Sequence, residues 1–193
     1  MPGGVMLAAY DDRGPLLFAR ERARLEGALA PYVLAIEHVG STAVVGLASK
    51  PTVDILAGIF RLSDTPRLVA RMEKLGYAYV EKFEQEIPER RYFHYPAKGG
   101  EADLFHVHMV EVGSPFWERH LLFRDFLRSH AEAARDYEAL KRRLAEVHGS
   151  DREPYTAAKA EFISKIEAEA RAERAKLSAG KSRDPPAAAR ASP

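Results

Sequence analysis

The chain of 193 residues is long enough for one domain with its own core, and it contains no cysteine, which excludes a disulfide framework and a thiolate zinc site. Its 29 basic and 28 acidic residues give a formal charge of +1, a balance that argues against a general nucleic-acid binder. No apolar run approaches the roughly 20 residues that span a bilayer. The N-terminus also lacks the pattern of a secretory signal, so we expect a cytoplasmic protein without a membrane partner.

The predicted elements alternate between helix and strand. In chain order they are a helix (14–30), a strand (32–39), one or two helical turns (42–49), a strand (51–59), a helix (65–75), three strands (77–83, 90–97 and 102–112) and three helices (one beginning at 114, one ending at 149 and one spanning 154–176). The helices carry apolar residues at helical spacing, and the strands are short and rich in β-branched and aromatic residues. Because strands come early and helices late, we expect an α+β fold.

The C-terminal segment differs in composition from the rest of the chain. Residues 177–193 read LSAGKSRDPPAAARASP, with almost no large apolar side chain and with helix breakers at Gly180, Pro185 and Pro186. Such a segment cannot bury enough apolar surface to offset its ordering entropy. We therefore expect a single domain over residues 1–176 and a disordered tail over residues 177–193.

A Gly-Ser corner separates the first two predicted strands. Gly40 lets the backbone approach an anion closely, and the N–H groups that begin a following helical turn carry partial positive charge. The Ser41 hydroxyl adds a further donor. The corner therefore fits a phosphate-binding turn, although an ordinary turn in which Ser41 caps a short helix fits the same residues.

An acidic residue, Asp54, lies inside the second predicted strand, where alternation places Thr52, Asp54 and Leu56 on one face. A carboxylate among apolar residues is costly to bury unless it is paired or bound to a metal, and Mg²⁺ prefers such oxygen ligands. Lys50, just before the strand, could neutralise a phosphate. The alternatives are an aspartate that accepts hydrogen bonds from a loop or pairs with an arginine, and a solvated lysine.

Two histidines, His106 and His108, share one face of the strand predicted over 102–112. Imidazoles at this spacing suit a transition metal or a contact with phosphate. Two histidines that are satisfied by neighbouring polar groups fit the same pattern, and without a third ligand they are a weak metal signal.

Several of these segments together resemble the GrpB family of small bacterial proteins. The stretch IEHVGSTAVVGLASKPTVDIL, residues 36–56, is close to the family signature IEHIGSTSVPGLAAKPIIDI. RRYFHY, FHVHMV, FWERHLLFRDFLRSHAEAARDYEALKRRLA and YTAAKAEFI then follow in the family's order. The resemblance covers roughly residues 10–166, which is far more specific than any one motif.

The resemblance implies a nucleotidyltransferase-like fold, in which helices pack mainly on one face of a small mixed sheet and a helical segment follows at the C-terminus. In that superfamily a Gly-Ser corner holds the phosphates of a nucleotide, and carboxylates on neighbouring strands hold two divalent metals. On this resemblance, Gly40 and Ser41 match the corner, and Asp54 matches the first carboxylate.

The match to a metal site is incomplete, because Leu56 stands where the second carboxylate belongs. On the later strand the family places histidines, which His106 and His108 match. One aspartate and two histidines make a poor site for a pair of Mg²⁺ ions. The three side chains could instead hold one Mn²⁺ or Zn²⁺, since imidazole suits softer metals.

Two basic residues fall within family motifs. Arg91 lies in the aromatic strand segment and Lys159 at the start of the last long helix, and we interpret both as groups that bind the outer phosphates of a triphosphate. Arg124 and Asp125, by contrast, are interpreted as a surface ion pair.

Two functions of different classes remain open. The first is a metal-dependent enzyme that transfers a nucleotidyl group from a nucleoside triphosphate to an unknown acceptor. The second is a non-catalytic nucleotide- or phosphate-binding module with a degenerate metal site, which serves as an accessory or sensing protein. The predicted catalytic and metal-binding residues are Asp54, His106 and His108, and the predicted phosphate-binding residues are Gly40, Ser41, Lys50, Arg91 and Lys159. The sequence does not determine the base preference, the acceptor, the metal or the oligomeric state.

Overall fold

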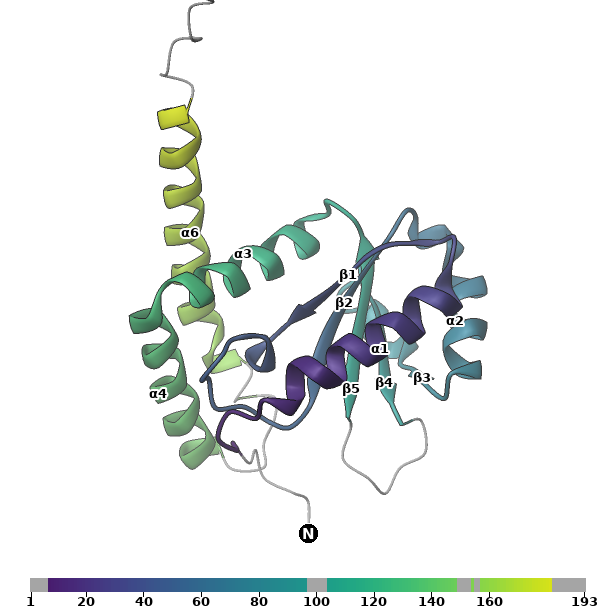
Figure 1. Ribbon diagram of the computed structural model, residues 1–193, viewed down its shortest axis with the longest axis horizontal. Helices are drawn as coiled ribbons and strands as arrows, with labels where there is room; N and C mark the ends of the chain where they lie inside the picture. Colours follow the sequence, from purple (N-terminus) through teal and green to yellow (C-terminus); the bar gives the residue numbers. More distant parts are fainter. Residues whose placement is uncertain (1–6, 97–103, 149–153, 155–156, 182–193) are drawn as a thin grey trace, which may run out of the picture.

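The structure, a computed structural model, describes residues 7–96, 104–148, 154 and 157–181 (Figure 1). Its helices and strands are α1 (Arg13–Leu29), β1 (Val33–Val39), β2 (Val53–Ile59), α2 (Thr65–Lys74), β3 (Ala78–Tyr79), β4 (Arg91–Tyr95), β5 (Phe105–Glu111), α3 (Pro115–Ser129), α4 (Ala131–His148) and α6 (Ala160–Lys181). Short 3₁₀ helices follow β1, β2 and β3 at Ser41–Ala43, Leu62–Asp64 and Glu81–Glu84. Within this described part of the chain, no helix combines the length and the apolar character that crossing a bilayer requires.

The five strands form one mixed sheet in the order β1-β2-β5-β4-β3. β2 and β5 run parallel at its centre, whereas the other neighbouring pairs are antiparallel. This arrangement confirms the predicted α+β class with a small mixed sheet and a helical C-terminal segment. The parallel pair matters most for the site, because its register sets Asp54 beside His106 and Leu56 beside His108.

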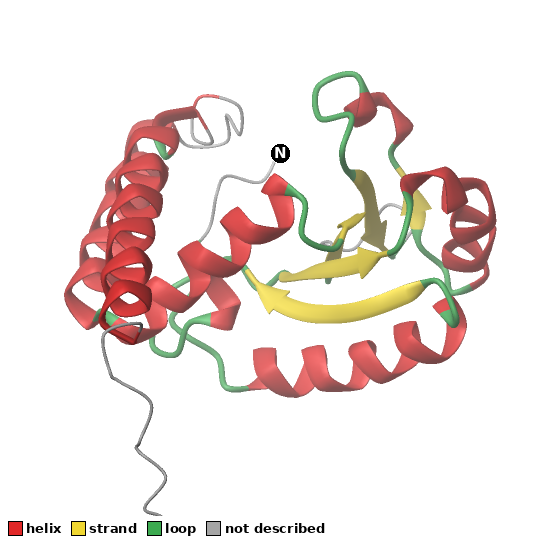
Figure 2. Ribbon diagram, turned by 90° about the horizontal axis from the view of Figure 1, so that it is seen from above, coloured by secondary structure: helices red, strands yellow, loops and turns green. Residues whose placement is uncertain are grey.

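One face of the sheet carries the main core of the protein, beneath α1 and α2. Leu25 of α1 and Leu68 of α2 are fully buried in the same cluster as Val53 and Ile55 of β2. In Figure 2 the helix α1 runs along this side of the sheet. Because side chains alternate along a strand, burying these residues turns Asp54 to the opposite face.

The opposite face of the sheet is covered in part by α3. The Ser114 hydroxyl caps this helix by accepting a hydrogen bond from the N–H of Trp117 at 3.3 Å, and Pro115 occupies its first turn. Trp117 packs over Gly58, where an added Cβ would lie 2.7 Å from the indole ring. Figure 2 shows α3 on the far side of the sheet from α1, with α4 and α6 gathered beside it. The bundle of three helices therefore stands next to the face that carries Asp54.

The predicted strand over residues 77–83 is shorter in the structure, where only Ala78–Tyr79 pair with a neighbour. Glu81–Glu84 form a 3₁₀ helix instead. The physical reason is composition, since glutamate and lysine are depleted in strands and the segment EKFE carries three such residues.

The last helix is longer than the sequence predicts. α6 continues to Lys181, past the expected start of the tail at residue 177. A single glycine near a helix end costs only about 1 kcal/mol, so Gly180 does not end the helix. The remainder of the predicted tail, residues 182–193, lies outside the described residues, and its disorder stays a prediction.

Candidate functional site

β1 ends in a sharp corner at Gly40, whose φ of 72° lies in the left-handed region that favours glycine. An added Cβ at this position would lie 2.3 Å from Oδ2 of Asp54. A larger residue therefore cannot replace Gly40 unless the Asp54 carboxylate moves. The corner and the carboxylate lie against each other, as the sequence analysis grouped them.

The corner lines a cavity of about 150 Å³ beside the helices that follow the sheet. The cavity is lined by the Gly40 backbone, by the polar or charged residues Ser41, Asp54, Arg124 and Lys159, and by Val44, Phe123, Leu127 and Tyr137. Four of the residues predicted from the sequence thus meet in one cavity, although they come from three distant parts of the chain.

Asp54 faces two histidines of the neighbouring strand β5. Nδ1 of His106 lies 3.3 Å from Oδ1 of Asp54, and Nε2 of His108 lies 3.9 Å from the same oxygen. Burial raises the pKa of Asp54, but the two imidazoles outweigh burial and hold this pKa well below its usual range. The carboxylate is therefore ionised at neutral pH and accepts a hydrogen bond from His106, which orients it.

Two histidines, His108 and His120, lie near Asp54 and are uncharged at neutral pH. Burial lowers the pKa of His108, and burial together with the nearby His108 lowers the pKa of His120 to about 4. Nδ1 of His120 lies 2.8 Å from the carbonyl oxygen of Phe116. Nδ1 of His108 is buried and has no hydrogen-bond partner among the residues that the structure describes.

The residues around Asp54 do not fit a two-metal centre. Leu56, at the position of the second carboxylate, is apolar and fully buried. Nδ1 of His106 is engaged by Asp54 itself. In the described part of the chain, no group of three or more histidine, cysteine, aspartate or glutamate side chains is arranged to hold a metal ion. Asp54, His106 and His108 come together as predicted and form a cluster of short polar contacts, and their role as metal ligands stays a prediction.

Lys141 of α4 is a site residue that the sequence analysis missed. Its side chain is 2% exposed, and Nζ donates hydrogen bonds to Oγ of Ser41, at 3.0 Å, and to the carbonyl oxygen of Ala48. Burial lowers the pKa of Lys141 to about 8, and the charge of Lys159 contributes to this shift. The buried ammonium group of Lys141 therefore fixes the position of the Ser41 hydroxyl.

A sequence signal for Lys141 does exist. Lys141 lies four residues after Tyr137 and three before Leu144, on the apolar stripe of its helix. Both neighbours are buried, and the Tyr137 ring centroid lies 5.0 Å from Nζ. A lysine on an apolar stripe must be either paired or functional, because lysine is almost never fully buried otherwise.

Arg124 is not the surface residue that the sequence suggested. It is 8% exposed, and its guanidinium donates to Glu37 at 2.6 Å, to Asp125 at 2.7 Å and to the carbonyl oxygen of His38 at 3.1 Å. The pair with Asp125 exists, but two further partners from β1, Glu37 and the carbonyl oxygen of His38, hold the arginine at the wall of the cavity. Only the tertiary contact with β1 distinguishes this arrangement from a solvated pair.

Replacing Arg124 with methionine should lower the free energy of unfolding by about 2–3 kcal/mol, since a charge-assisted hydrogen bond contributes this much. The expected loss stays below that of a completely buried pair because the Glu37 side chain is 38% exposed. Urea unfolding measures the effect. The matched control is Arg22→Met, which breaks an exposed pair with Glu26 and should cost less than 1 kcal/mol. Equal losses in the two variants would contradict the buried role of Arg124.

Arg91 and Lys50 are not brought into the cavity. Arg91 lies on the opposite face of the sheet, where its guanidinium contacts Glu84 at 3.2 Å and donates to Oγ1 of Thr65 at 3.2 Å. Alternate residues of a strand share a face, so Arg91 lies on the same face as Phe93, which belongs to the core beneath α1 and α2. Lys50 is half-buried, and its charge helps to lower the pKa of Lys159 after the larger effect of burial.

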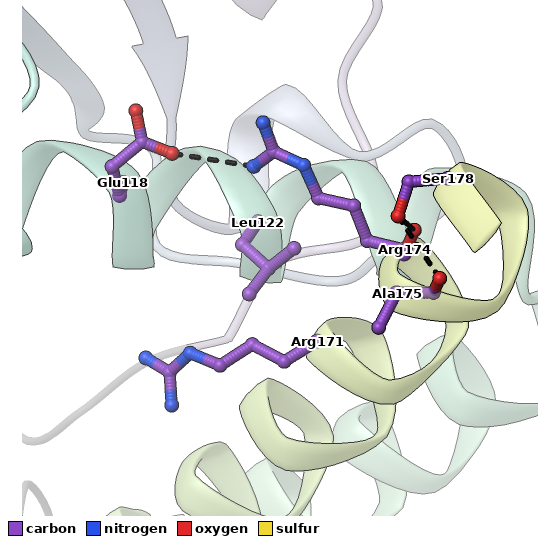
Figure 3. A pocket seen from close by; sticks show the side chains of 6 residues that line it. All are labelled: Glu118, Leu122, Arg171, Arg174, Ala175 and Ser178. Atoms are coloured by element: carbon purple, nitrogen blue, oxygen red, sulfur yellow. Dashed lines mark hydrogen bonds and ion pairs between the residues drawn. The ribbon is translucent and has the colours of Figure 1, made fainter. Parts of the chain in front are cut away.

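A larger hollow of about 340 Å³ lies between α3 and α6, away from these residues (Figure 3). Its charged groups are already paired, Arg174 with Glu118 at 3.3 Å and Arg171 with Glu167 at 3.6 Å. In Figure 3 the side chain of Arg171 extends away from the pair of Arg174 and Glu118. None of the residues predicted to carry chemistry lines this hollow, so the smaller cavity is the candidate site.

Comparison with known proteins agrees with the resemblance seen in the sequence. A family model described as GrpB protein matches residues 4–169. UPF0157 protein YqkA of Bacillus subtilis is 37% identical over 167 residues, which are 86% of this chain and 47% of YqkA, so the chain spans about half the length of that relative. A dephospho-CoA kinase of Mycolicibacterium paratuberculosis is 28% identical over 179 residues, 80% of this chain and 43% of the kinase. The crystal structure of conserved protein GrpB from Enterococcus faecalis superimposes with a TM-score of 0.76 at 33% identity, covering 86% of this chain and 96% of that one.

Proposed function

This chain belongs to the GrpB protein family, and from that premise we propose that its cavity binds the phosphate groups of a nucleotide. The observation that carries the proposal is that Ser41 and Lys159 line one cavity while Lys141 donates a hydrogen bond to Ser41. A hydroxyl donor flanked by two ammonium groups is a site for an anion.

The charges around the cavity call for a ligand with more than one negative charge. Burial lowers the pKa of both Lys141 and Lys159, and the two ammonium groups repel each other. The charge of Asp54 acts in the opposite direction and raises the pKa of Lys159. Arg124 is paired with Glu37 and Asp125. An anion in the cavity would relieve the cost of burying the two lysines, and a polyphosphate does so better than a single negative charge.

Asp54 would itself repel a phosphate at the corner, because its carboxylate lies against Gly40. A divalent cation shared between Asp54 and phosphate oxygens removes this repulsion. Mg²⁺ is commonly held by one or two carboxylates together with substrate phosphates, so a single carboxylate is enough. We therefore expect nucleotide binding to strengthen in the presence of Mg²⁺ or Mn²⁺, even though Leu56 replaces the second carboxylate.

The size of the cavity limits what part of a nucleotide it holds. Pockets for drug-sized ligands usually measure about 300–1,000 Å³, and this cavity measures about 150 Å³. Phosphate groups fit such a volume better than a whole nucleotide does. We therefore expect the phosphates to occupy the cavity and the nucleoside to lie outside it.

A second candidate function is nucleotidyl transfer, the activity implied by the resemblance to nucleotidyltransferase-like proteins. The observation in its favour is Asp54, an ionised carboxylate that lies against the corner. Leu56 in place of a second carboxylate favours binding without catalysis. Radiolabelled ATP incubated with the protein and a cell extract separates the two functions. Pyrophosphate release that depends on Asp54 supports the enzyme, and binding without release supports the module.

ATP with Mn²⁺ should raise the melting temperature of the full chain by about 3–10 °C when the ligand exceeds its Kd by 10–100-fold. Ser41→Ala combined with Asp54→Asn should remove most of this gain, because the variant loses the hydroxyl donor and the charge of the carboxylate. Differential scanning fluorimetry measures the shift.

The matched control for the thermal shift is Ser129→Ala, which removes an exposed hydroxyl at the end of α3 and should keep the full gain. Dephospho-CoA and inorganic triphosphate are tested beside ATP, since a relative is named a dephospho-CoA kinase. If no ligand of this set shifts the melting temperature with Mg²⁺, with Mn²⁺ or with a chelator, the phosphate-binding function is wrong.

A further inference from the structure

We propose that Arg90 forms a second anion-binding subsite, which takes a carboxylate or a further phosphate on the same face of the sheet as Asp54. The proposal rests on the proposed function in one respect only, in that both subsites would serve the same ligand or a pair of ligands. Arg90 is a residue that the sequence analysis passed over in favour of its neighbour, Arg91.

Arg90 lies on the same face of the sheet as Asp54. It precedes β4 and has the parity of Tyr92, which pairs with His108 in the sheet register. The guanidinium carbon of Arg90 lies 5.3 Å from the ring centroid of Tyr92 and 5.9 Å from that of Phe116. Phe83 adds a third ring at 5.7 Å. Aromatic rings on several sides hold the guanidinium in place.

The side chain of Arg90 has no counter-ion among the residues that the structure describes. It makes no hydrogen bond or ion pair with them, and its Nε is a buried donor without a partner. Glu86 and Glu89 act on it only through longer-range electrostatics. Arg91, one residue later, shows the contrast, since it is bonded to Glu84, Thr65 and the carbonyl oxygen of Pro88.

A half-buried guanidinium without an anion is costly, and cation–π contacts recover only part of that cost. Each contact is worth about 0.5–2 kcal/mol, whereas the desolvation of a charged group costs several kcal/mol. An anionic group of a ligand would supply the counter-charge that the described residues do not provide. Carboxylate and phosphate both match the planar fork of a guanidinium.

His108 connects this subsite to the cavity. Its Nε2 lies 3.9 Å from Asp54, and its ring centroid lies 5.3 Å from that of Tyr92, over which Arg90 is placed. β4 lies two strand spacings, or about 10 Å, from β2, and Arg90 lies four residues, or about 13 Å, along β4 from His94, which is level with Asp54. The backbones of Arg90 and Asp54 are therefore about 16 Å apart. An extended ligand with phosphates at one end and an acidic group at the other would engage both, as would a nucleotide and an acidic second substrate.

The test uses the full chain and follows the ring resonances of His108 and Tyr92 by NMR during separate titrations with inorganic phosphate and with acetate. We expect a saturable shift with at least one anion in the wild type. Arg90→Met should weaken the apparent affinity at least tenfold. Arg90→Lys should weaken it less, because lysine keeps the positive charge but lacks the planar guanidinium that bonds to two oxygens at once. The matched control is Arg91→Met, which removes the adjacent arginine from the opposite face and should leave the titration unchanged.

Ser41→Ala separates this inference from the proposed function. The shift should persist in Ser41→Ala, because that variant disables only the corner. A shift that is lost in Ser41→Ala and kept in Arg90→Met would place the anion in the cavity and overturn the Arg90 subsite while supporting phosphate binding. Absence of any shift in the wild type would overturn it as well. A response to acetate or to phosphate alone supports the subsite and identifies its anion.

Thermal unfolding distinguishes a ligand-binding Arg90 from a structural one. Because the Arg90 side chain has no bonded partner in the described part of the chain, Arg90→Met should keep or raise the melting temperature while it weakens anion binding at least tenfold. A large drop in melting temperature with unchanged anion binding would show that the arginine only fills the space between the three rings, and the inference would be wrong.

Discussion

Gly40→Ala should abolish binding of ATP and Mn²⁺ and lower the free energy of unfolding by about 2–5 kcal/mol. About 1–2 kcal/mol of this comes from placing an L-residue at a φ of 72°. A further 1–3 kcal/mol comes from overpacking, because the new methyl group would lie 2.3 Å from Oδ2 of Asp54. The carboxylate must then move away from the corner, and the polar wall of the cavity is lost. Urea unfolding and isothermal titration calorimetry measure the two effects.

Gly46→Ala is the matched control for this variant. Gly46 has a φ of 81°, so it carries a similar backbone cost, but no heavy atom lies within 4 Å of an added Cβ. The difference between the two variants therefore isolates the contact with Asp54. If both lose the same stability and both keep ATP binding, the corner does not depend on the carboxylate, and the site described here is wrong.

Lys141→Met should weaken the binding of ATP and Mn²⁺ at least tenfold without lowering the melting temperature. The desolvation cost of the buried ammonium disappears with the charge, and we expect this gain to offset the loss of the hydrogen bonds to Ser41 and to the carbonyl oxygen of Ala48. Binding suffers because Ser41 loses the donor that holds its hydroxyl and the cavity loses a positive charge. The control is Lys165→Met, which removes a lysine that is 71% exposed on α6 and should change neither property.

The titration of Lys141 provides an independent check by pH. Its pKa is about 8 in the folded protein and 10.5 without the fold, so between these values the unfolded chain binds one more proton than the folded one. The stability of the wild type should therefore rise with pH from about 8 to 10.5, relative to Lys141→Met, by up to about 3 kcal/mol. Below pH 8 the difference in free energy of unfolding between the wild type and Lys141→Met should be constant. Affinity for ATP should fall above pH 8 in the wild type and lack this step in the variant. A stability difference that does not change with pH would contradict a buried, titrating lysine.

The sequence predicted the parts of the site that depend on local geometry. Gly40 and Asp54 could be singled out because a glycine corner and a polar residue in an apolar strand are visible in a short window. His106 and His108 followed from alternation along one strand. In the structure these residues lie together, and His106 contacts Asp54 directly.

The assignment of the basic residues required the folded chain. Arg90 and Arg91 are neighbours in sequence with the same chemistry, and only the register of β4 against β5 decides which of them faces Asp54. Lys141 is a hundred residues from Ser41, and its bond to the corner exists only because α4 packs beside α3 and against the segment around Val44 and Leu47.

The amino-acid sequence by itself determined the family, the α+β class, the corner and the polar residue of β2, because short-range patterns and backbone restrictions specify them. Only the tertiary structure decided which basic side chains lie near the corner. A long lysine or arginine side chain can reach solvent, a carboxylate or a ligand, and the packing of helices distant in sequence decides which of these it contacts.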